Sequence, residues 1–183
     1  SRFDSIGLEA TKESRRTYRD LLFTTPGLEE FISGVILYDE TLRTNSLGDV
    51  SFPDLIAERG MIPGAKVDTG LVDLAGFSGE QITEGLDGLR ERVETYRDLG
   101  ARFAKWRAVI AVGECIPSGT CIKANAHALA RYAAICQEAG VVPIVEPEVL
   151  MDGDHTIEQC EDATQITLDA VFSELLAQRI LLE

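Results

Sequence analysis

Three short apolar stretches of the chain each carry two charged residues that lie two positions apart. The pairs are Lys66 and Asp68, Lys105 and Arg107, and Glu146 and Glu148. Because side chains alternate between the two faces of an extended strand, the members of each pair point the same way. Pairs of buried carboxyl groups serve as acids and bases near neutral pH, since burial and a like neighbour both raise a carboxyl pKa. Three such strands therefore predict one shared polar site.

The stretch 141–150 is the most informative of the three. It is apolar apart from its two glutamates, which is typical of a strand buried on both faces in a parallel sheet. The alternative is a set of surface salt bridges on half-exposed strands. Such strands should alternate polar and apolar residues throughout, and these stretches do not.

Composition limits the classes of function. The chain has 183 residues, of which 45% are hydrophobic and 26% are charged, and this length is enough for a substantial core. A net charge of −14 argues against nucleic-acid or anionic-membrane surfaces as partners. A phosphorylated substrate stays open, because a local basic cluster can override the global sign.

Cysteine and histidine usage indicates a reducing compartment, hence a cytoplasmic protein, and predicts no metal site. No two cysteines are spaced as CxxC, and both histidines lie far from any cysteine pair, so a zinc site is not expected. These residues are Cys115, Cys121, Cys136, Cys160, His127 and His155. We find no signal peptide and no apolar run long enough for a membrane span.

Strand and helix patterns alternate along the chain, which predicts parallel strands joined by right-handed crossovers. Polar residues gather towards the downstream ends of the strands, where function collects in such folds. No glycine-rich phosphate motif opens a helix directly after a strand. The predicted elements are helices 12–22, 53–59, 83–99 and one ending at Gly140, strands 32–37, 62–68, 103–110 and 141–150, a glycine-rich loop 70–79, and a last helix with a Thr156–Gln159 capping box.

Residues 180–183 are interpreted as the opening of a fifth strand. Four strands and the start of a fifth do not close an eight-stranded barrel, which takes ~250 residues. The chain is therefore an open sheet or part of a barrel, and its abrupt ends favour the second. We expect residues 1–183 to form one incomplete barrel domain, truncated at both ends.

The sequence resembles class I fructose-bisphosphate aldolase, the Schiff-base type. The matching segments follow the order of that family and cover nearly the whole chain. Residues 125–129 add a cue towards a bacterial member. The segments are Arg2-Phe3-Asp4-Ser5-Ile6-Gly7, Gly34-Val35-Ile36-Leu37, Lys66-Val67-Asp68, Gly85-Leu86-Asp87-Gly88-Leu89, Phe103-Ala104-Lys105-Trp106-Arg107, Leu129-Ala130-Arg131-Tyr132-Ala133, Val145-Glu146-Pro147-Glu148 and Asp152-Gly153-Asp154-His155.

The resemblance implies a (β/α)8 TIM barrel, of which this chain carries about strands 2–5 and the start of strand 6. It implies a lyase of glycolysis and gluconeogenesis that reversibly cleaves fructose 1,6-bisphosphate to dihydroxyacetone phosphate and glyceraldehyde 3-phosphate. The reaction proceeds through a lysine imine, without metal or other cofactor. The resemblance also implies a homo-oligomer, since many family members are tetramers.

Residue by residue, the resemblance gives Glu146 the acid/base position. Lys105 would lower the pKa of the imine-forming amine by like-charge repulsion, so that the amine is neutral enough to attack. Glu148 would hold the cationic cluster. Substrate hydroxyl or phosphate oxygens would be bound by Lys66, Arg107 and Arg2.

Several alternatives stay open at this point. The lysine that forms the imine in the family matches no residue here, so the chain alone is expected to be inactive. It could instead be a catalytically silent partial barrel that binds sugar phosphates or serves assembly, or part of a transaldolase-like lyase. Asp68 is either a reacting group or a salt-bridge partner of Lys66, and Trp106 is interpreted as a core residue.

Overall fold

The computed structural model describes residues 3–182. Its elements are α1 (Lys12–Thr24), β1 (Gly34–Leu37), α2 (Asp39–Leu42), α3 (Phe52–Glu58), β2 (Ile62–Lys66), β3 (Gly70–Asp73), β4 (Gln81–Glu84), α4 (Leu89–Asp98), β5 (Phe103–Ile110), α5 (Gly119–Glu138), β6 (Val142–Val149) and α6 (Ile157–Ala177), with short 3-10 helices at Asp4–Ile6 and Leu28–Glu30. The predicted strands and helices are thus present, with two exceptions: the segment between β2 and β5, and the C-terminal residues 180–182.

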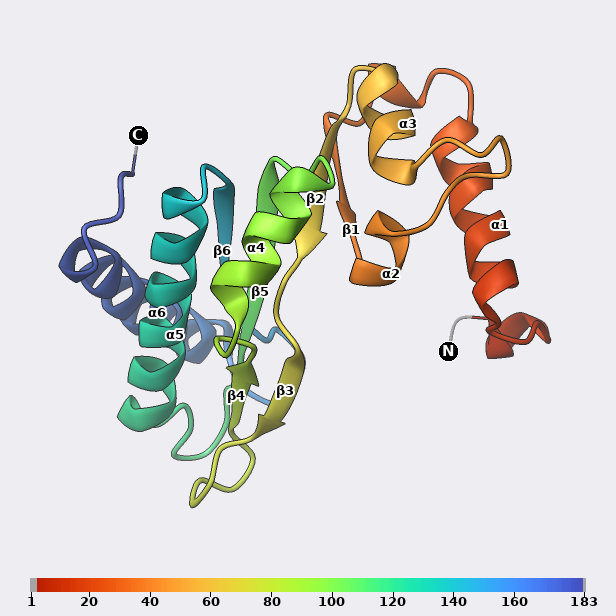
Figure 1. Cartoon of the computed structure of the whole chain (residues 1–183). Coiled ribbons are helices and arrows are strands. Elements are labelled where there is room, and N and C mark those ends of the chain that lie inside the picture. The colour runs from red at the N-terminus through yellow and green to blue at the C-terminus, as the bar shows by residue number, and fades with distance from the viewer. Residues whose placement is uncertain (1–2, 183) are drawn as a thin grey trace.

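Four parallel strands form the main sheet in the order β1-β2-β5-β6. Figure 1 shows these strands in the middle of the molecule, with α5 and α6 beside β6 and the helices α1 to α3 gathered at the other end. The parallel alternation predicted from the sequence is confirmed. The sheet is open, as expected for part of a barrel.

The segment between β2 and α4 differs from the prediction. Residues 70–79 were expected as a loop and 83–99 as a helix, but β3 and β4 form an antiparallel hairpin and α4 begins only at Leu89. The Thr83 hydroxyl donates to a carbonyl of β5 at 2.7 Å, which holds β4 extended against the main sheet. Gly85 and Gly88 follow with φ of 129° and 62°, a conformation that stops a helix from starting earlier.

The helices α5 and α6 begin at well-formed caps. The Ser118 hydroxyl accepts a hydrogen bond from the backbone N–H of Cys121 at 3.1 Å. Thr156 and Gln159 form the predicted capping box, in which each side chain bonds the backbone N–H of the other. Both caps satisfy N–H groups that the helix cannot pair internally, so each helix starts at a defined residue and turns back along the sheet.

The main core lies between the sheet and its helices. Trp106 of β5 is fully buried and stacks on Tyr132 of α5, with ring centroids 5.6 Å apart. The interpretation of Trp106 as a core residue is confirmed. The same core continues to the N-terminal helices, where Phe23 and Phe52 meet edge to face at 5.5 Å.

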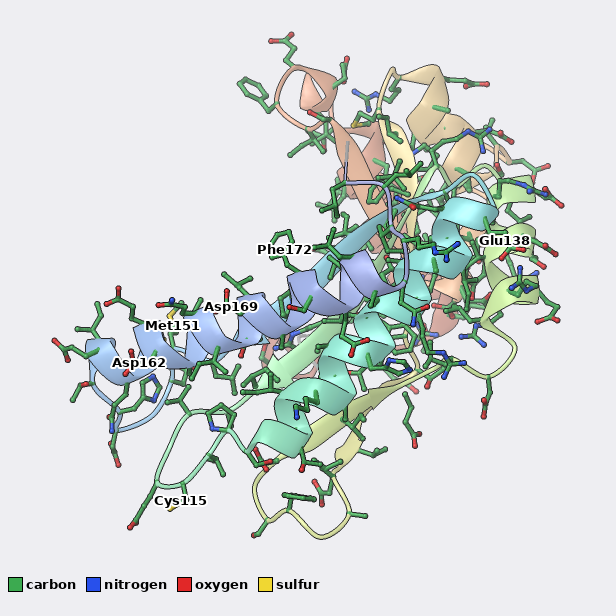
Figure 2. The ribbon with its side chains drawn as sticks, turned by 90° about the vertical axis from the view of Figure 1, so that its left-hand side faces the viewer. Cys115, Glu138, Met151, Asp162, Asp169 and Phe172 are labelled. Atoms are coloured by element: carbon green, nitrogen blue, oxygen red, sulfur yellow. The ribbon has the colours of Figure 1, made fainter. Side chains whose placement is uncertain are left out.

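The opposite face of the sheet is more open than the sequence predicted. Val142 and Ile144 of β6 are 65% and 39% exposed, so the expectation of burial on both faces is wrong for this chain. The helices cover one face only, and no described element covers the other. The apolar side chains of α6 are also partly uncovered, and Figure 2 shows Phe172, which is half exposed, projecting from this helix.

The predicted fifth strand does not form over residues 180–182. The side-chain amide of Gln137 on α5 binds the backbone of Leu181 instead, donating to its carbonyl at 2.7 Å and accepting from its N–H at 3.0 Å. A strand requires a paired neighbour, and this backbone is paired with a side chain. Glu183 lies outside the described residues.

One testable electrostatic contact joins α1 to α2. Hydrogen bonds from Arg15, and then from Arg19, lower the pKa of Glu40 to about 2. A carboxyl group with a lowered folded-state pKa stabilises the fold fully above its unfolded pKa of about 4.5, and this contribution is lost as the pH falls towards 2. Glu40→Gln should therefore lower the free energy of unfolding at pH 7 and have progressively less effect between pH 4.5 and 2.

Urea unfolding of the intact protein and its variants at several pH values measures this difference. Glu161→Gln, which removes an exposed carboxylate on α6, is the matched control and should change the free energy of unfolding little at any of these pH values. A destabilisation by Glu40→Gln that stays constant down to pH 2 would contradict the assignment.

Candidate active site

The six charged residues singled out in the sequence lie together on the open face of the sheet. Along β5 the residues Ala104, Trp106 and Ala108 are buried against the helices, whereas Lys105 and Arg107 alternate with them and are only partly buried. Strand alternation therefore separates an apolar outer face from a charged inner face. The structure brings these residues together on one face, as expected, and their role as one site stays a prediction.

Strand register places the charges. Lys66 of β2 is the Cα partner of Lys105 of β5, so two ammonium groups start from neighbouring positions on one face. Arg107 is in register with Glu146 of β6. Two unpaired like charges so close would destabilise the fold, because like charges on neighbouring strands repel. Each cation is instead paired with a carboxylate.

The ion pairs across β5 and β6 are diagonal. The Lys105 ammonium lies 2.6 Å from Oε2 of Glu146, and the Arg107 guanidinium donates from Nε to Oε2 of Glu148. Each cation reaches the carboxylate two residues beyond its register partner along β6. The hydrogen bond to Glu148 and the attraction of nearby carboxylates raise the pKa of Arg107.

Lys66 closes the group on the side of β2. Its ammonium donates to the carboxylate of Asp68, and also to the Asp68 carbonyl at 3.2 Å. Its Nζ lies 6.0 Å from the ring centroid of Tyr38. The Asp68 side chain is only 5% exposed, and its second oxygen Oδ2 has no hydrogen-bond partner among residues 3–182. Asp68 is thus a salt-bridge partner of Lys66, one of the two readings that the sequence left open.

A glycine on β2 leaves space for an aromatic ring on this face. A Cβ at Gly64 of β2 would lie 2.3 Å from the Phe103 ring, far inside van der Waals contact. Phe103 lies two residues before Lys105, so its ring occupies the same face, nearer the start of the strand. The result is an apolar patch upstream of the charges on the same face.

Charge balance defines what the site can do. Lys66, Lys105 and Arg107 are matched by three carboxylates, and the side chains of Lys105 and Glu146 are 28% and 31% exposed. An anionic ligand could therefore take over donors that now bind carboxylates, while a freed carboxylate accepts or returns a proton. Within the described residues, no group of three or more His, Cys, Asp and Glu side chains could hold a metal ion.

The remaining predicted residue, Arg2, lies outside the described residues. Sequence reasoning also missed two residues that support the site from behind: Thr83, which binds the carbonyl of Arg107, and Tyr132, whose hydroxyl lies 2.7 Å from the carbonyl of Ala104. Tyr132 lies in one of the segments that resemble the aldolase family. The apolar pattern of a helix, however, does not reveal which group a tyrosine hydroxyl contacts in the fold.

Comparison with known proteins decides the family. The chain matches the family described as fructose-bisphosphate aldolase class-I over residues 1–183. It belongs to the class I fructose-bisphosphate aldolase family. A probable fructose-bisphosphate aldolase class 1 of Xanthomonas campestris pv. campestris is 61% identical over 182 residues, which are 100% of this chain and 54% of that protein. The chain thus spans about half the length of the curated relatives it matches.

Other aldolases agree with this placement. A cytosolic fructose-bisphosphate aldolase of Arabidopsis thaliana is 51% identical over the whole chain and 46% of its own length. The fructose-bisphosphate aldolase of Plasmodium falciparum, solved with TRAP and a small molecule inhibitor, superposes with a TM-score of 0.95 at 49% identity, covering 98% of this chain and 52% of that one. The α/β fold of the chain is therefore part of the aldolase barrel. The higher identity to the bacterial relative agrees with the bacterial cue in the sequence.

Proposed function

We propose that the protein containing this chain is a class I fructose-bisphosphate aldolase, a lyase that reversibly cleaves fructose 1,6-bisphosphate to dihydroxyacetone phosphate and glyceraldehyde 3-phosphate. The observation that carries the proposal is the Lys105–Glu146 pair, which lies beside Arg107 and Lys66 on one face of a family-matched sheet. The proposal assigns imine formation to a lysine outside residues 1–183, and residues 1–183 to a single barrel domain.

Glu146 is the proposed acid/base. Its carboxylate is partly exposed on the open face and held by a single cation, so it can accept a proton from a substrate hydroxyl when the carbon–carbon bond breaks. It can return that proton in the reverse direction and also serve proton transfer during imine formation. Glu148 binds Arg107 and so keeps the guanidinium turned towards the site.

Lys66 and Arg107 are the proposed substrate-binding cations, together with Arg2. Arg107 can offer a phosphate two parallel N–H donors, and the Lys66 ammonium supplies a mobile charge. Arg107 can exchange the partly exposed Glu148 for a phosphate, whereas Lys66 can bind a substrate oxygen while it keeps the buried Asp68, since its ammonium has further N–H donors. The substrate is a sugar phosphate, and no cofactor is needed for this chemistry.

Location and assembly complete the proposal. A cytoplasmic location is supported by the relatives of Arabidopsis thaliana described as cytosolic. Among the helices that the structure describes, none is long and apolar enough to cross a membrane. Homo-oligomer formation, inferred from the family resemblance, stays a prediction.

Borohydride trapping tests the proposal directly. The intact protein is incubated with dihydroxyacetone phosphate, reduced, digested and analysed by mass spectrometry. A covalent adduct on a lysine outside this chain is expected. No adduct would remove the imine mechanism and favour a silent sugar-phosphate-binding barrel, and an adduct on Lys66 or Lys105 would reassign the nucleophile.

The Glu146→Gln variant keeps the size of the side chain and removes its charge. We expect kcat for fructose 1,6-bisphosphate cleavage to fall by about 10²–10⁴-fold, the usual contribution of a positioned proton-transfer group. Glu161→Gln on α6 is the control and should retain activity. Turnover of Glu146→Gln at the wild-type rate would contradict the assigned role.

The Lys105→Met variant tests charge repulsion on the imine-forming amine. Removing the ammonium should raise the pH at which borohydride trapping is half-maximal by up to about one unit, since Glu146 already offsets part of the charge. Lys105→Arg keeps the charge and should leave the midpoint in place. An unchanged midpoint for Lys105→Met would leave Lys105 with a packing role.

The Arg107→Ala variant should mainly weaken substrate binding. Loss of a charge-assisted contact to phosphate should raise KM for fructose 1,6-bisphosphate by about tenfold or more, because such a bond contributes about 1.5–3 kcal/mol. Arg107→Lys retains the charge but not the two parallel N–H donors, so its KM should lie between those of the wild type and Arg107→Ala. Steady-state kinetics that show a fall in kcat at unchanged KM would contradict the binding role.

A further inference from the structure

Tyr132 makes an unusual contact between the outer layer and the main sheet. Its side chain projects from α5 and is fully buried. Its hydroxyl lies 2.7 Å from the carbonyl oxygen of Ala104 on β5 and 3.2 Å from that of Ile144 on β6. A helix side chain thus contacts the backbone of two neighbouring strands at one point. The hydroxyl has a single proton, so the shorter contact is its main hydrogen bond and the other oxygen is a second acceptor.

This point lies directly behind the proposed proton-transfer pair. The Ala104 carbonyl belongs to the peptide unit that leads into Lys105, and Ile144 is the register partner of Lys105. Glu146 follows Ile144 by two residues and points to the same face. The hydroxyl therefore binds the backbone from the outer face where, on the inner face, the Lys105 ammonium and Glu146 carboxylate meet at 2.6 Å.

The tyrosine is itself held rigidly. Its ring stacks on Trp106 at 5.6 Å with an interplanar angle of 29°, and Trp106 lies between Lys105 and Arg107 in the sequence. Burial raises the pKa of Tyr132, which favours the protonated hydroxyl that donates this hydrogen bond. Because the phenol ring is buried and stacked, its hydroxyl has little freedom to move and can restrain the backbone of both strands.

We propose that Tyr132 is a positioning residue that fixes the position of β5 relative to β6, so that Lys105 and Glu146 stay paired on the inner face. It touches neither substrate nor reacting atoms. Its effect on turnover rests on the proposed aldolase function, whereas its effect on the Lys105–Glu146 pair does not. Two readouts therefore separate a failure of this inference from a failure of the proposed function.

The kinetic readout uses Tyr132→Phe, which keeps the ring and its stacking on Trp106 but removes the donor. Tyr96→Phe is the matched control, because Tyr96 is a buried tyrosine of α4 whose hydroxyl lies near Asp39 of α2. We expect Tyr132→Phe to lower kcat by about 10- to 100-fold with KM within about threefold, since small misplacements of catalytic groups have effects of this size. Tyr96→Phe should keep kcat within about twofold.

A purely structural role for the hydroxyl would lower the urea midpoint of both variants and leave kcat of both near the wild-type value. That result would overturn the inference, and so would an equal loss of kcat in both variants.

The second readout does not depend on activity. The intact protein is labelled with a trace of an amine-acylating reagent, and the labelling rate of Lys105 is measured by mass spectrometry relative to Lys123, an exposed lysine of α5. Loosening of the ion pair in Tyr132→Phe should raise this ratio by about threefold or more, and Tyr96→Phe should leave it unchanged. An unchanged ratio in Tyr132→Phe would overturn the inference even if the wild type cleaves substrate. If the ratio rises in Tyr132→Phe but the wild type does not cleave substrate, the inference about Tyr132 stands and only the proposed function is rejected.

Discussion

The register between β5 and β6 is the constraint on which the site depends. It places Arg107 opposite Glu146 and lets Lys105 reach the same glutamate at 2.6 Å. A shift of the register by one residue would turn every side chain of one strand to the other face. Lys105 would then enter the apolar layer against the helices, and Trp106 would face the open side. The same alternation therefore builds the core and the site together, and neither can change alone.

Pairing of opposite charges offsets the repulsion within this cluster. Three cations and three carboxylates share one face, and each cation has a carboxylate within ion-pair reach. Half-buried pairs of this kind contribute modestly to stability, because desolvation offsets the attraction. Their value for the proposed aldolase is chemical: donors for phosphate and an acceptor for a proton are held in place for a sugar phosphate.

Much of this could be predicted from the sequence. The spacing of Lys105 with Arg107 and of Glu146 with Glu148 predicts a shared face, because strand geometry is strictly periodic. The capping box at Thr156 and the parallel alternation depend on equally local rules. The hairpin β3–β4 could not be predicted, because Thr83 is held extended by a bond to β5, a contact distant in the sequence. The specific ion pairs and the position of the Tyr132 hydroxyl depend on register and helix packing, which no local pattern encodes.

A double-mutant cycle between Lys105 and Glu146, with kcat for fructose 1,6-bisphosphate cleavage measured in the intact protein, tests the central claim most directly. If the two side chains act as one unit, the double variant Lys105→Met/Glu146→Gln should lose about as much activity as the more damaging single variant, since groups that act together are strongly non-additive. Losses that multiply independently would contradict the account.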